Sequence, residues 1–261
     1  MAYEHILYER DDHIVTITLN RPKVLNAMRP QTCLELARAF TDFSDDDKAR
    51  VAVLTGAGER AFCVGADLKY RASAEEQSGQ QERPVDEMIA VIARCNKPIV
   101  GAINGYAVGG GLEMALRCDI ILAAEHALLG LPEVRRGLVA DSGGIYHLPR
   151  RIPYHQAMGL ILTGELIPAG EALRMGLVNA VAPAGGLDEL VKEWTGKILE
   201  CSPVALQAAK EMVKSFLLLP EEPDLPQIDR LPAVQRLRQS EDYVDGPRAF
   251  AEKRGPIWKG R

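Results

Sequence analysis

The sequence predicts an α/β fold, and three observations carry this prediction. Short apolar segments of strand type recur along the first two hundred residues, most of them end at glycine or asparagine, and segments with helical periodicity follow them. Strands that alternate with helices are typical of α/β proteins. The 261 residues suit one large domain with a small appendage. We expect the core over residues 1–200 and a helical appendage over residues 201–261.

The first elements are predicted by apolar spacing. In HIVTITLNRP, apolar residues alternate with threonines, which predicts a half-buried strand ending at the turn of residues 20–22. RVAVLTG, at residues 50–56, predicts a short buried strand that a glycine ends. Between them, PQTCLELARAFTDF predicts an amphipathic helix, because its apolar residues follow i, i+3, i+4, i+7 spacing: Cys33, Leu36, Ala37 and Phe40.

The middle and end of the chain continue this alternation. Residues 99–103 predict a strand, a helix begins near Gly110, and DIILAAE is the next strand. Residues 71–87 lack apolar periodicity, so we expect an exposed, mobile loop there. Apolar residues over 187–198 predict a helix, and Ser202 with Pro203 suits the start of another. The proline-rich segment 217–227 reads as a connector.

Composition excludes several classes of protein. A net charge of −5 gives no attraction of the whole molecule to nucleic acid or anionic membranes. The first fifteen residues carry acids instead of a signal peptide's basic and apolar regions, and no apolar run reaches the roughly 18 residues of a membrane span. The five cysteines and five histidines are scattered, which favours reduced thiols and no metal site. We therefore expect a cytoplasmic protein.

The segment NGYAVGGGLEMALRCD, residues 104–119, concentrates glycines where the predicted helix begins. Amides at a helix N-terminus have no intrahelical acceptor and lie at the positive end of the dipole. Because Gly109, Gly110 and Gly111 have no side chains, a ligand oxygen could approach these amides, as a developing oxyanion requires. Close backbone packing or a tight turn is the alternative. A phosphate loop is a weak third, because neither GxGxxG nor GxxxxGK occurs.

A second loop and two carboxyl groups strengthen this interpretation. In RAFCVGADLK, residues 60–69, Ala66 could present a second free amide. Glu113 could cap its own helix, and Glu133 could be a solvated acid or a partner of Arg135. Two amides together with two carboxyl groups instead indicate a site that stabilises an enolate and moves protons.

Four blocks, NRPKVLNAM, ERAFCVGADLK, NGYAVGGGLEMALRCDI and GLPEVRRGL, resemble in order and spacing the signature of the crotonase (enoyl-CoA hydratase/isomerase) superfamily. The resemblance runs from about Tyr8 to the C-terminus. It implies a spiral of repeated ββα units with C-terminal helices that build a homotrimer, often paired into a dimer of trimers.

The resemblance also implies a reaction and a site. Ala66 and Gly110 would form the oxyanion hole, and Glu113 and Glu133 would be the catalytic acids. Having both acids favours hydration or dehydration of a 2-enoyl-CoA thioester. Glu113 would deprotonate the attacking water, and Glu133 would deliver a proton to C2. No metal or redox cofactor is needed, because coenzyme A is part of the substrate.

Further residues on these motifs, and near the C-terminus, are implied to contact coenzyme A or the acyl group. Each lysine among them could instead be an ordinary solvated side chain. In the family, residues at the positions of Phe250 and Lys253 cover the nucleotide from a neighbouring subunit. The full set is Lys23, Leu25, Ala27, Asp67, Leu68, Lys69, Gly109, Phe250 and Lys253.

LVADSGGIYHLPRRIP and SEDYVDGPRAFAEKRGPIWKGR resemble the carnitinyl-CoA dehydratase branch of the superfamily. Ala140 departs from the pattern, since relatives usually have proline there, which leaves the loop shape and the substrate open. Three rivals remain. A Δ3-Δ2-enoyl-CoA isomerase needs only one acid-base group. A thioester hydrolase could use Ser142 and His147, without a GxSxG motif to support it. An acyl-CoA-binding protein would not need paired glutamates.

Overall fold

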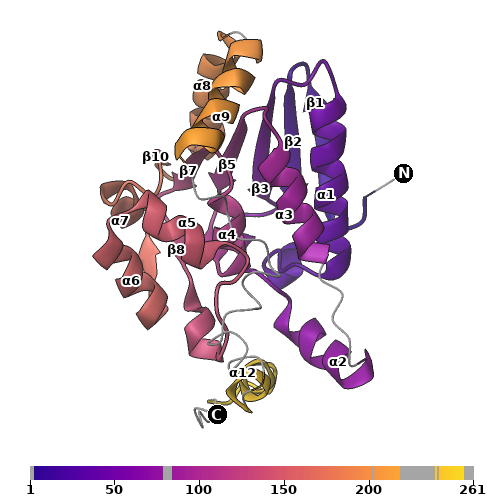
Figure 1. The fold of residues 1–261 in the computed structure, drawn as a ribbon, viewed down its shortest axis with the longest axis vertical. Coiled ribbons are helices and arrows are strands. Elements are labelled where there is room, and N and C mark those ends of the chain that lie inside the picture. The colour runs from indigo at the N-terminus through magenta and orange to yellow at the C-terminus, as the bar shows by residue number, and fades with distance from the viewer. Residues whose placement is uncertain (1–2, 79–83, 202, 218–238, 240, 256–261) are drawn as a thin grey trace.

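Two β-sheets form the framework of the molecule (Figure 1). The computed structural model describes the chain except residues 1–2, 79–83, 202, 218–238, 240 and 256–261. Within the described chain, the larger sheet has six strands, in the order β1 (Ile6–Asp11), β2 (Ile14–Leu19), β3 (Val51–Gly56), β5 (Ile99–Ile103), β7 (Ile120–Ala124) and β10 (Ala180–Ala182). β1 and β2 are antiparallel, and the other neighbours are parallel.

Among the described residues, three strands of the smaller sheet each follow a strand of the larger one, and the fourth, β9 (Leu166–Pro168), follows helix α6 (Tyr154–Thr163). In the described ranges the order of this sheet is β4 (Ala61–Cys63), β6 (Tyr106–Val108), β8 (Leu128–Gly130) and β9 (Leu166–Pro168). The pairs β3/β4, β5/β6 and β7/β8 each place one strand in each sheet before the chain enters a helix. This repetition of ββα units confirms the predicted α/β fold.

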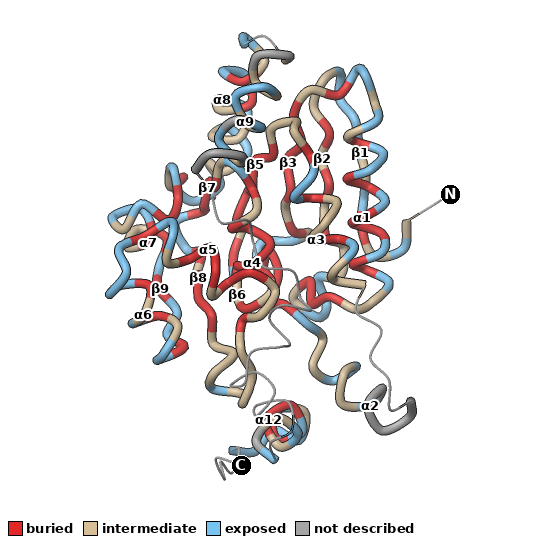
Figure 2. The backbone as a smooth tube through the Cα atoms, in the orientation of Figure 1, coloured by how far each residue is buried: buried red, intermediate tan, exposed pale blue. Residues whose placement is uncertain are grey.

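Helices cover both faces of the larger sheet. α1 (Pro30–Asp45) and α3 (Pro84–Arg94) pack together over one face, and α8 (Leu187–Leu199) covers the other. Successive residues of a strand point to opposite faces, so Leu54 joins the first core and Val51 the second. A strand covered on both sides has no polar face, which explains the continuous apolar run VAVL at residues 51–54 of β3 (Figure 2).

Shorter helices surround the smaller sheet and the junction between the sheets (Figure 1). They are η1 (Pro22–Val24), α4 (Gly110–Ala115), η2 (Pro132–Arg136), α5 (Gly144–Arg151), α6 (Tyr154–Thr163) and α7 (Ala169–Arg174). α4 begins at Gly110, as predicted from the glycine cluster.

The loop expected over residues 71–87 is a correction. The chain is helical in α2 (Leu68–Ser78) and again in α3 from Pro84, with residues 79–83 outside the described chain. α2 gave no periodic signal because it has no apolar stripe, although its alanines favour a helix. In α3 the stripe is present, and its members follow i, i+3, i+4, i+7 spacing: Val85, Met88, Ile89 and Ile92.

The C-terminal part is mostly helical where it is described. α8 and α9 (Pro203–Leu217) begin where the sequence predicts them. α12 (Glu241–Ala251) packs against α2 and η2. The predicted connector lies, from residue 218 onward, outside the described residues. The boundary near residue 200 stays a prediction.

Other expectations concern the whole chain. All five cysteines are free, and Cys201 alone among them is exposed, in agreement with the prediction of mostly buried thiols. Within the described ranges, no helix combines the length and apolarity needed to cross a membrane. The same residues include no cluster of three or more side chains able to hold a metal ion.

Candidate active site

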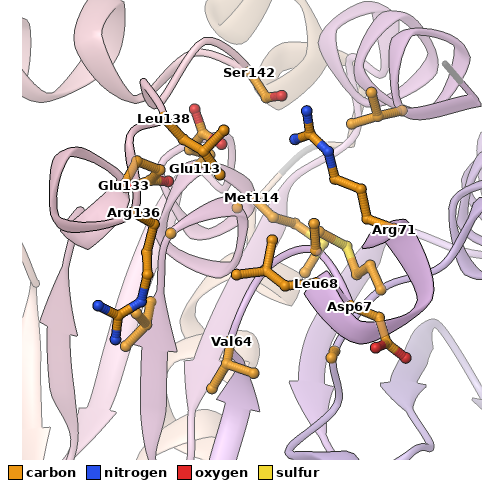
Figure 3. A pocket seen from close by; sticks show the side chains of 18 of the residues that line it. Val64, Asp67, Leu68, Arg71, Glu113, Met114, Glu133, Arg136, Leu138 and Ser142 are labelled. Carbon is orange, nitrogen blue, oxygen red and sulfur yellow. The ribbon is translucent and has the colours of Figure 1, made fainter. Parts of the chain in front are cut away.

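A cavity of about 1500 Å³ lies where the four sequence blocks meet. Each block contributes a residue to its wall: Ala27, Ala66, Gly110 and Glu133. Figure 3 shows Glu113 and Glu133 on one side of this pocket, with Leu68 and Met114 across from them. Segments more than a hundred residues apart in sequence therefore share one cavity.

The loop before α2 directs the Ala66 amide. Met28 N donates to Gly65 O at 2.7 Å, and Asp67 N donates to Met28 O at 2.8 Å, which makes a parallel bridge between Met28 and Ala66. In such a bridge the bonds come from the residues flanking Ala66, so its own N–H points to the opposite side. Ala66 lines the cavity.

The Gly110 amide lies beside this loop. Gly110 is the first residue of α4, where an amide has no intrahelical acceptor. Gly65 has a φ of +80°, and a Cβ atom on it would lie 2.7 Å from Gly110 N. Only glycine allows this close approach, and it brings the Ala66 and Gly110 loops together.

Other glycines of the cluster serve close packing, the alternative that the sequence left open. A Cβ on Gly111 would lie 2.0 Å from Cys63 O, and one on Gly105 would lie 2.3 Å from Arg60 O. The cluster therefore has two purposes: Gly105 and Gly111 seat the β6–α4 unit against β4, and Gly110 presents its amide.

Glu113 is buried, and its partner lies on another helix. Its Oε1 accepts a hydrogen bond from Gly144 N at 2.9 Å, at the start of α5. Glu113 therefore does not cap its own helix, which was the alternative explanation for it. The bond ties α4 to α5 and holds the carboxyl group at the cavity wall.

Glu133 faces the glycine loop from η2. Its Oε1 lies 3.1 Å from where a Cβ on Gly109 would be. Its Oε2 is buried and has no hydrogen-bond partner among the described residues. Arg135 is not its partner, because Arg135 Nε donates to Thr163 O at 2.6 Å. Glu133 thus offers a free oxygen inside the pocket wall.

Burial controls the protonation of both glutamates. Burial raises the pKa of Glu113, the charges of Glu133 and Asp141 raise it further, and the Gly144 amide opposes them. Burial also raises the pKa of Glu133, aided by Asp141 and opposed by its own backbone amide. Two carboxyl groups close together in a dry pocket resist simultaneous ionisation. The pair can therefore hold one proton near neutral pH.

The cavity wall includes all but one of the residues expected to contact coenzyme A or the acyl group. These are Lys23, Leu25, Ala27, Asp67, Leu68, Lys69, Gly109 and Phe250. Lys253 is not among the lining residues in the described chain. Phe250 lines the pocket of its own chain, and the Arg136 guanidinium lies 5.0 Å from its ring centroid.

The pocket also contains residues that the sequence analysis missed. The Arg71 guanidinium of α2 stacks 4.9 Å over the Tyr243 ring of α12 and hydrogen-bonds its hydroxyl, across 172 positions of sequence. Met88 and Ile89 form part of the apolar wall. The spacing of α3 could have revealed the apolar pair, whereas no local signal predicts Arg71 with Tyr243.

The residues of the hydrolase alternative are not brought together at the cavity. Ser142 lines it, and its backbone oxygen accepts from Arg117 Nη2 at 2.6 Å. His147 is buried in α5, with its ring against the edge of Tyr146, and is absent from the cavity lining in the described part of the chain. The cavity wall therefore does not present a serine nucleophile together with a histidine base.

The enoyl-CoA hydratase/isomerase family model matches residues 9–261, and the chain belongs to this family. It is 38% identical to the carnitinyl-CoA dehydratase of Escherichia coli O157:H7 over 260 residues, covering 99% of each chain. It is 41% identical to that of Proteus mirabilis over 250 residues, 95% of each. The crystal structure of carnitinyl-CoA hydratase from Mycobacterium avium is similar, with a TM-score of 0.82, 34% identity and 98% and 99% coverage.

Proposed function

We propose that this protein is a hydro-lyase that reversibly adds water to a 2-enoyl-CoA thioester. The observation that carries this proposal is the pair of carboxyl groups, that of the buried Glu113 and that of Glu133 with its buried Oε2, in one pocket with the Ala66 and Gly110 amides. The relatives named as carnitinyl-CoA dehydratases support the same reaction class. Carnitinyl-CoA or a similar short acyl thioester is the corresponding candidate substrate.

In the hydration direction, the thioester oxygen is held between the Ala66 and Gly110 amides. Negative charge develops on this oxygen as C2 and C3 react, and losing one such donor typically costs about 10²–10³-fold in rate. Glu113, ionised, takes a proton from water, whose oxygen bonds to C3. Glu133, protonated, delivers its proton to C2. Two carboxyl groups with raised pKa values resist simultaneous ionisation, so they supply one acid and one base in the same pocket.

Coenzyme A binding is assigned to the cations and backbone at the pocket entrance. Lys23 and Lys69 line the pocket and are candidates for the phosphate groups. Lys253 is not among the residues that line this pocket in the described chain, so its proposed contact with coenzyme A would be in the pocket of a neighbouring subunit. A homotrimer or a dimer of trimers, and a cytoplasmic location, complete the proposal. Light scattering would give three or six times the 28.6 kDa chain mass.

The isomerase is the second candidate, because the family includes both activities. An isomerase needs one acid-base group to move a proton between two carbons. An isomerase would have no use for the Glu133 carboxyl group, whose buried Oε2 has no hydrogen-bond partner among the described residues. Burying such an oxygen lowers the stability of the fold, so the isomerase leaves Glu133 without an explanation. At Ala140, where the sequence departs from its relatives, the loop packs closely: a Cβ on Gly144 would lie 2.8 Å from the Ala140 Cβ.

The first experiment is the loss of enoyl-thioester absorbance with crotonyl-CoA and crotonobetainyl-CoA. The wild type should form the 3-hydroxy product, and Glu133→Gln should be slower by about 10²–10⁴-fold. Glu189→Gln is the matched control, because this exposed glutamate only pairs with Lys192 and should leave the rate unchanged. Isomerisation of a 3-enoyl-CoA without hydration, or release of free coenzyme A, would contradict the proposal.

A further inference from the structure

The carboxylate of Asp67, directly after Ala66, is held by two arginines. Its Oδ2 accepts from Arg29 Nε at 2.9 Å and from Arg21 Nη2 at 3.2 Å. Its Oδ1 accepts from the Tyr70 amide at 3.2 Å, in the first turn of α2. The side chain is only 9% exposed, and Figure 3 shows it directed away from Glu113 and Glu133. Both oxygens of the Asp67 carboxylate therefore already have hydrogen-bond donors within the protein.

Arg21 joins both sides of the Met28–Ala66 bridge. One guanidinium nitrogen, Nη1, donates to Ala27 O, and the other, Nη2, donates to Asp67. The Arg21 side chain is 12% exposed, so this contact is largely shielded from water. A planar guanidinium with several donors can span two acceptors in a fixed geometry, which a lysine cannot do.

The segment on the far side of the bridge is anchored as well. Asn26 Oδ1 accepts from the Arg21 amide at 2.9 Å, and Asn26 Nδ2 donates to Ala61 O at 2.8 Å. Asn26 is 1% exposed and has a φ of 56°. The bridge therefore rests on a rigid support that reaches β4, and Asp67 fastens the Ala66 loop to it.

The charge on Asp67 is maintained in the folded protein. Burial alone would raise the pKa of Asp67, but the Tyr70 amide and the two arginines outweigh burial and hold this pKa below its ordinary value. Removing one partner of a buried ion pair leaves an uncompensated charge, which is strongly unfavourable. Arg21 would be left in that state if Asp67 lost its charge.

We propose that Asp67, held by Arg21 and Arg29, is a positioning residue that aims the Ala66 amide at the thioester oxygen. This inference rests on the proposed function of the Ala66 amide. It assigns to the Asp67 side chain a task different from contact with coenzyme A. The peptide group before Ala66 and the one after it each make one hydrogen bond of the bridge. If the Asp67 side chain is no longer held by the two arginines, these peptide groups can rotate, and the Ala66 N–H turns away from the thioester oxygen.

The kinetic test compares Asp67→Asn with the wild type. Both oxygens of Asp67 accept hydrogen bonds, so an asparagine must set its NH2 group against a donor, either the two guanidinium groups or the Tyr70 amide. We therefore expect kcat to fall about 10- to 100-fold, as for an approximately 1 Å misplacement, with KM changed less than about 3-fold. Asp46→Asn is the matched control. Asp46 also pairs with an arginine, Arg10, at 3.4 Å and accepts a backbone amide, but it lies outside the pocket wall.

A spectroscopic test reads the amide directly. In a Glu133→Gln background, which keeps the enoyl thioester intact, the carbonyl stretch of bound crotonyl-CoA reports hydrogen bonding to the oxygen. Adding Asp67→Asn should move this band toward its position in free crotonyl-CoA, and adding Asp46→Asn should not. If Asp67→Asn does not fold, Arg29→Gln replaces it, because the Arg29 side chain is 40% exposed and its loss leaves Arg21 on Asp67.

The outcomes separate this inference from the proposed function. If the wild type hydrates its substrate while Asp67→Asn and Arg29→Gln leave kcat and the carbonyl band unchanged, Asp67 has no positioning role. A rise in KM alone would assign Asp67 to coenzyme A contact and overturn the inference. If no hydration occurs but the band shifts with Asp67→Asn, the positioning role stands and the proposed reaction fails.

Discussion

At the scale of single residues, the glutamates owe their chemistry to where the fold buries them. Glu113 and Glu133 lie twenty positions apart, on α4 and η2, and their charges meet only because both elements line one cavity. An exposed glutamate keeps a pKa far below neutral pH. The desolvation of these two makes a protonated acid available near neutral pH, which hydration chemistry requires.

The raised pKa values predict how stability depends on pH. Above the ordinary glutamate pKa of 4.5, the native state binds more protons than the unfolded chain. The free energy of unfolding is therefore highest below pH 4.5, and it falls as the pH rises through the raised pKa values of the native state. Each group contributes a slope of up to about 1.4 kcal/mol per pH unit. Glu113→Gln keeps an oxygen acceptor for the Gly144 amide but cannot ionise, so it removes the loss of stability that comes from ionising Glu113.

Urea unfolding at a series of pH values tests this prediction. The stability of Glu113→Gln relative to the wild type should grow between about pH 5 and pH 8, because only the wild type must ionise Glu113 there. Glu189→Gln, whose carboxyl group is exposed, should give a constant difference. Parallel curves for Glu113→Gln and the wild type would show that burial does not perturb Glu113.

At the scale of elements, contact between α4 and β4 sets the position of the Gly110 amide. Gly111→Ala would place a Cβ atom 2.0 Å from Cys63 O, so α4 would have to move away from β4. We expect a loss of more than about 3 kcal/mol in the free energy of unfolding and a large loss of hydration rate. Thermal and urea unfolding, together with the absorbance assay, measure both effects.

A glycine in another helix supplies the control. Gly196 lies inside α8, and apart from the backbone of its own helix no atom of the described residues lies within 4 Å of its Cβ position. Gly196→Ala should therefore be neutral, or stabilise by up to about 1 kcal/mol through helix propensity. Equal effects of the two substitutions would mean that the contact between α4 and β4 is not tight.

At the scale of the whole molecule, the C-terminal helix closes part of the pocket formed by the first half of the chain. α12 contacts both α2 and η2. Gly246 lies so close to η2 that a Cβ on it would be 1.7 Å from Arg136 O. Substrate binding should therefore depend on residues more than a hundred positions away from Glu113 and Glu133.

Gly246→Ala tests this dependence. The substitution should force α12 away from η2, and because Phe250 and Tyr243 line the pocket, KM should rise by more than kcat falls. Steady-state kinetics with crotonyl-CoA measure the split. Val244→Ala, an exposed position on the same helix, should leave both parameters unchanged. A fall in kcat alone would place the role of α12 in the chemical step.

Much of this protein could be predicted from local patterns. Apolar periodicity predicted β2, α1 and α8, because each period reports the face that an element buries, and a short continuous apolar run predicted β3. Glycine spacing and the motif blocks predicted the Ala66 and Gly110 loops and the two glutamates. These signals lie within a few residues of the feature they report, so they can be found in one sequence.

Tertiary structure alone decided the partners. The Gly144 amide on Glu113, the ion pairs of Asp67 with Arg21 and Arg29, and the stacking of Arg71 on Tyr243 join residues from 31 to 172 positions apart. Helix α2 likewise has no apolar stripe of its own and packs against α12. The physical reason is that periodicity records whether a face is buried, whereas the identity of its neighbour depends on how distant elements are placed in space.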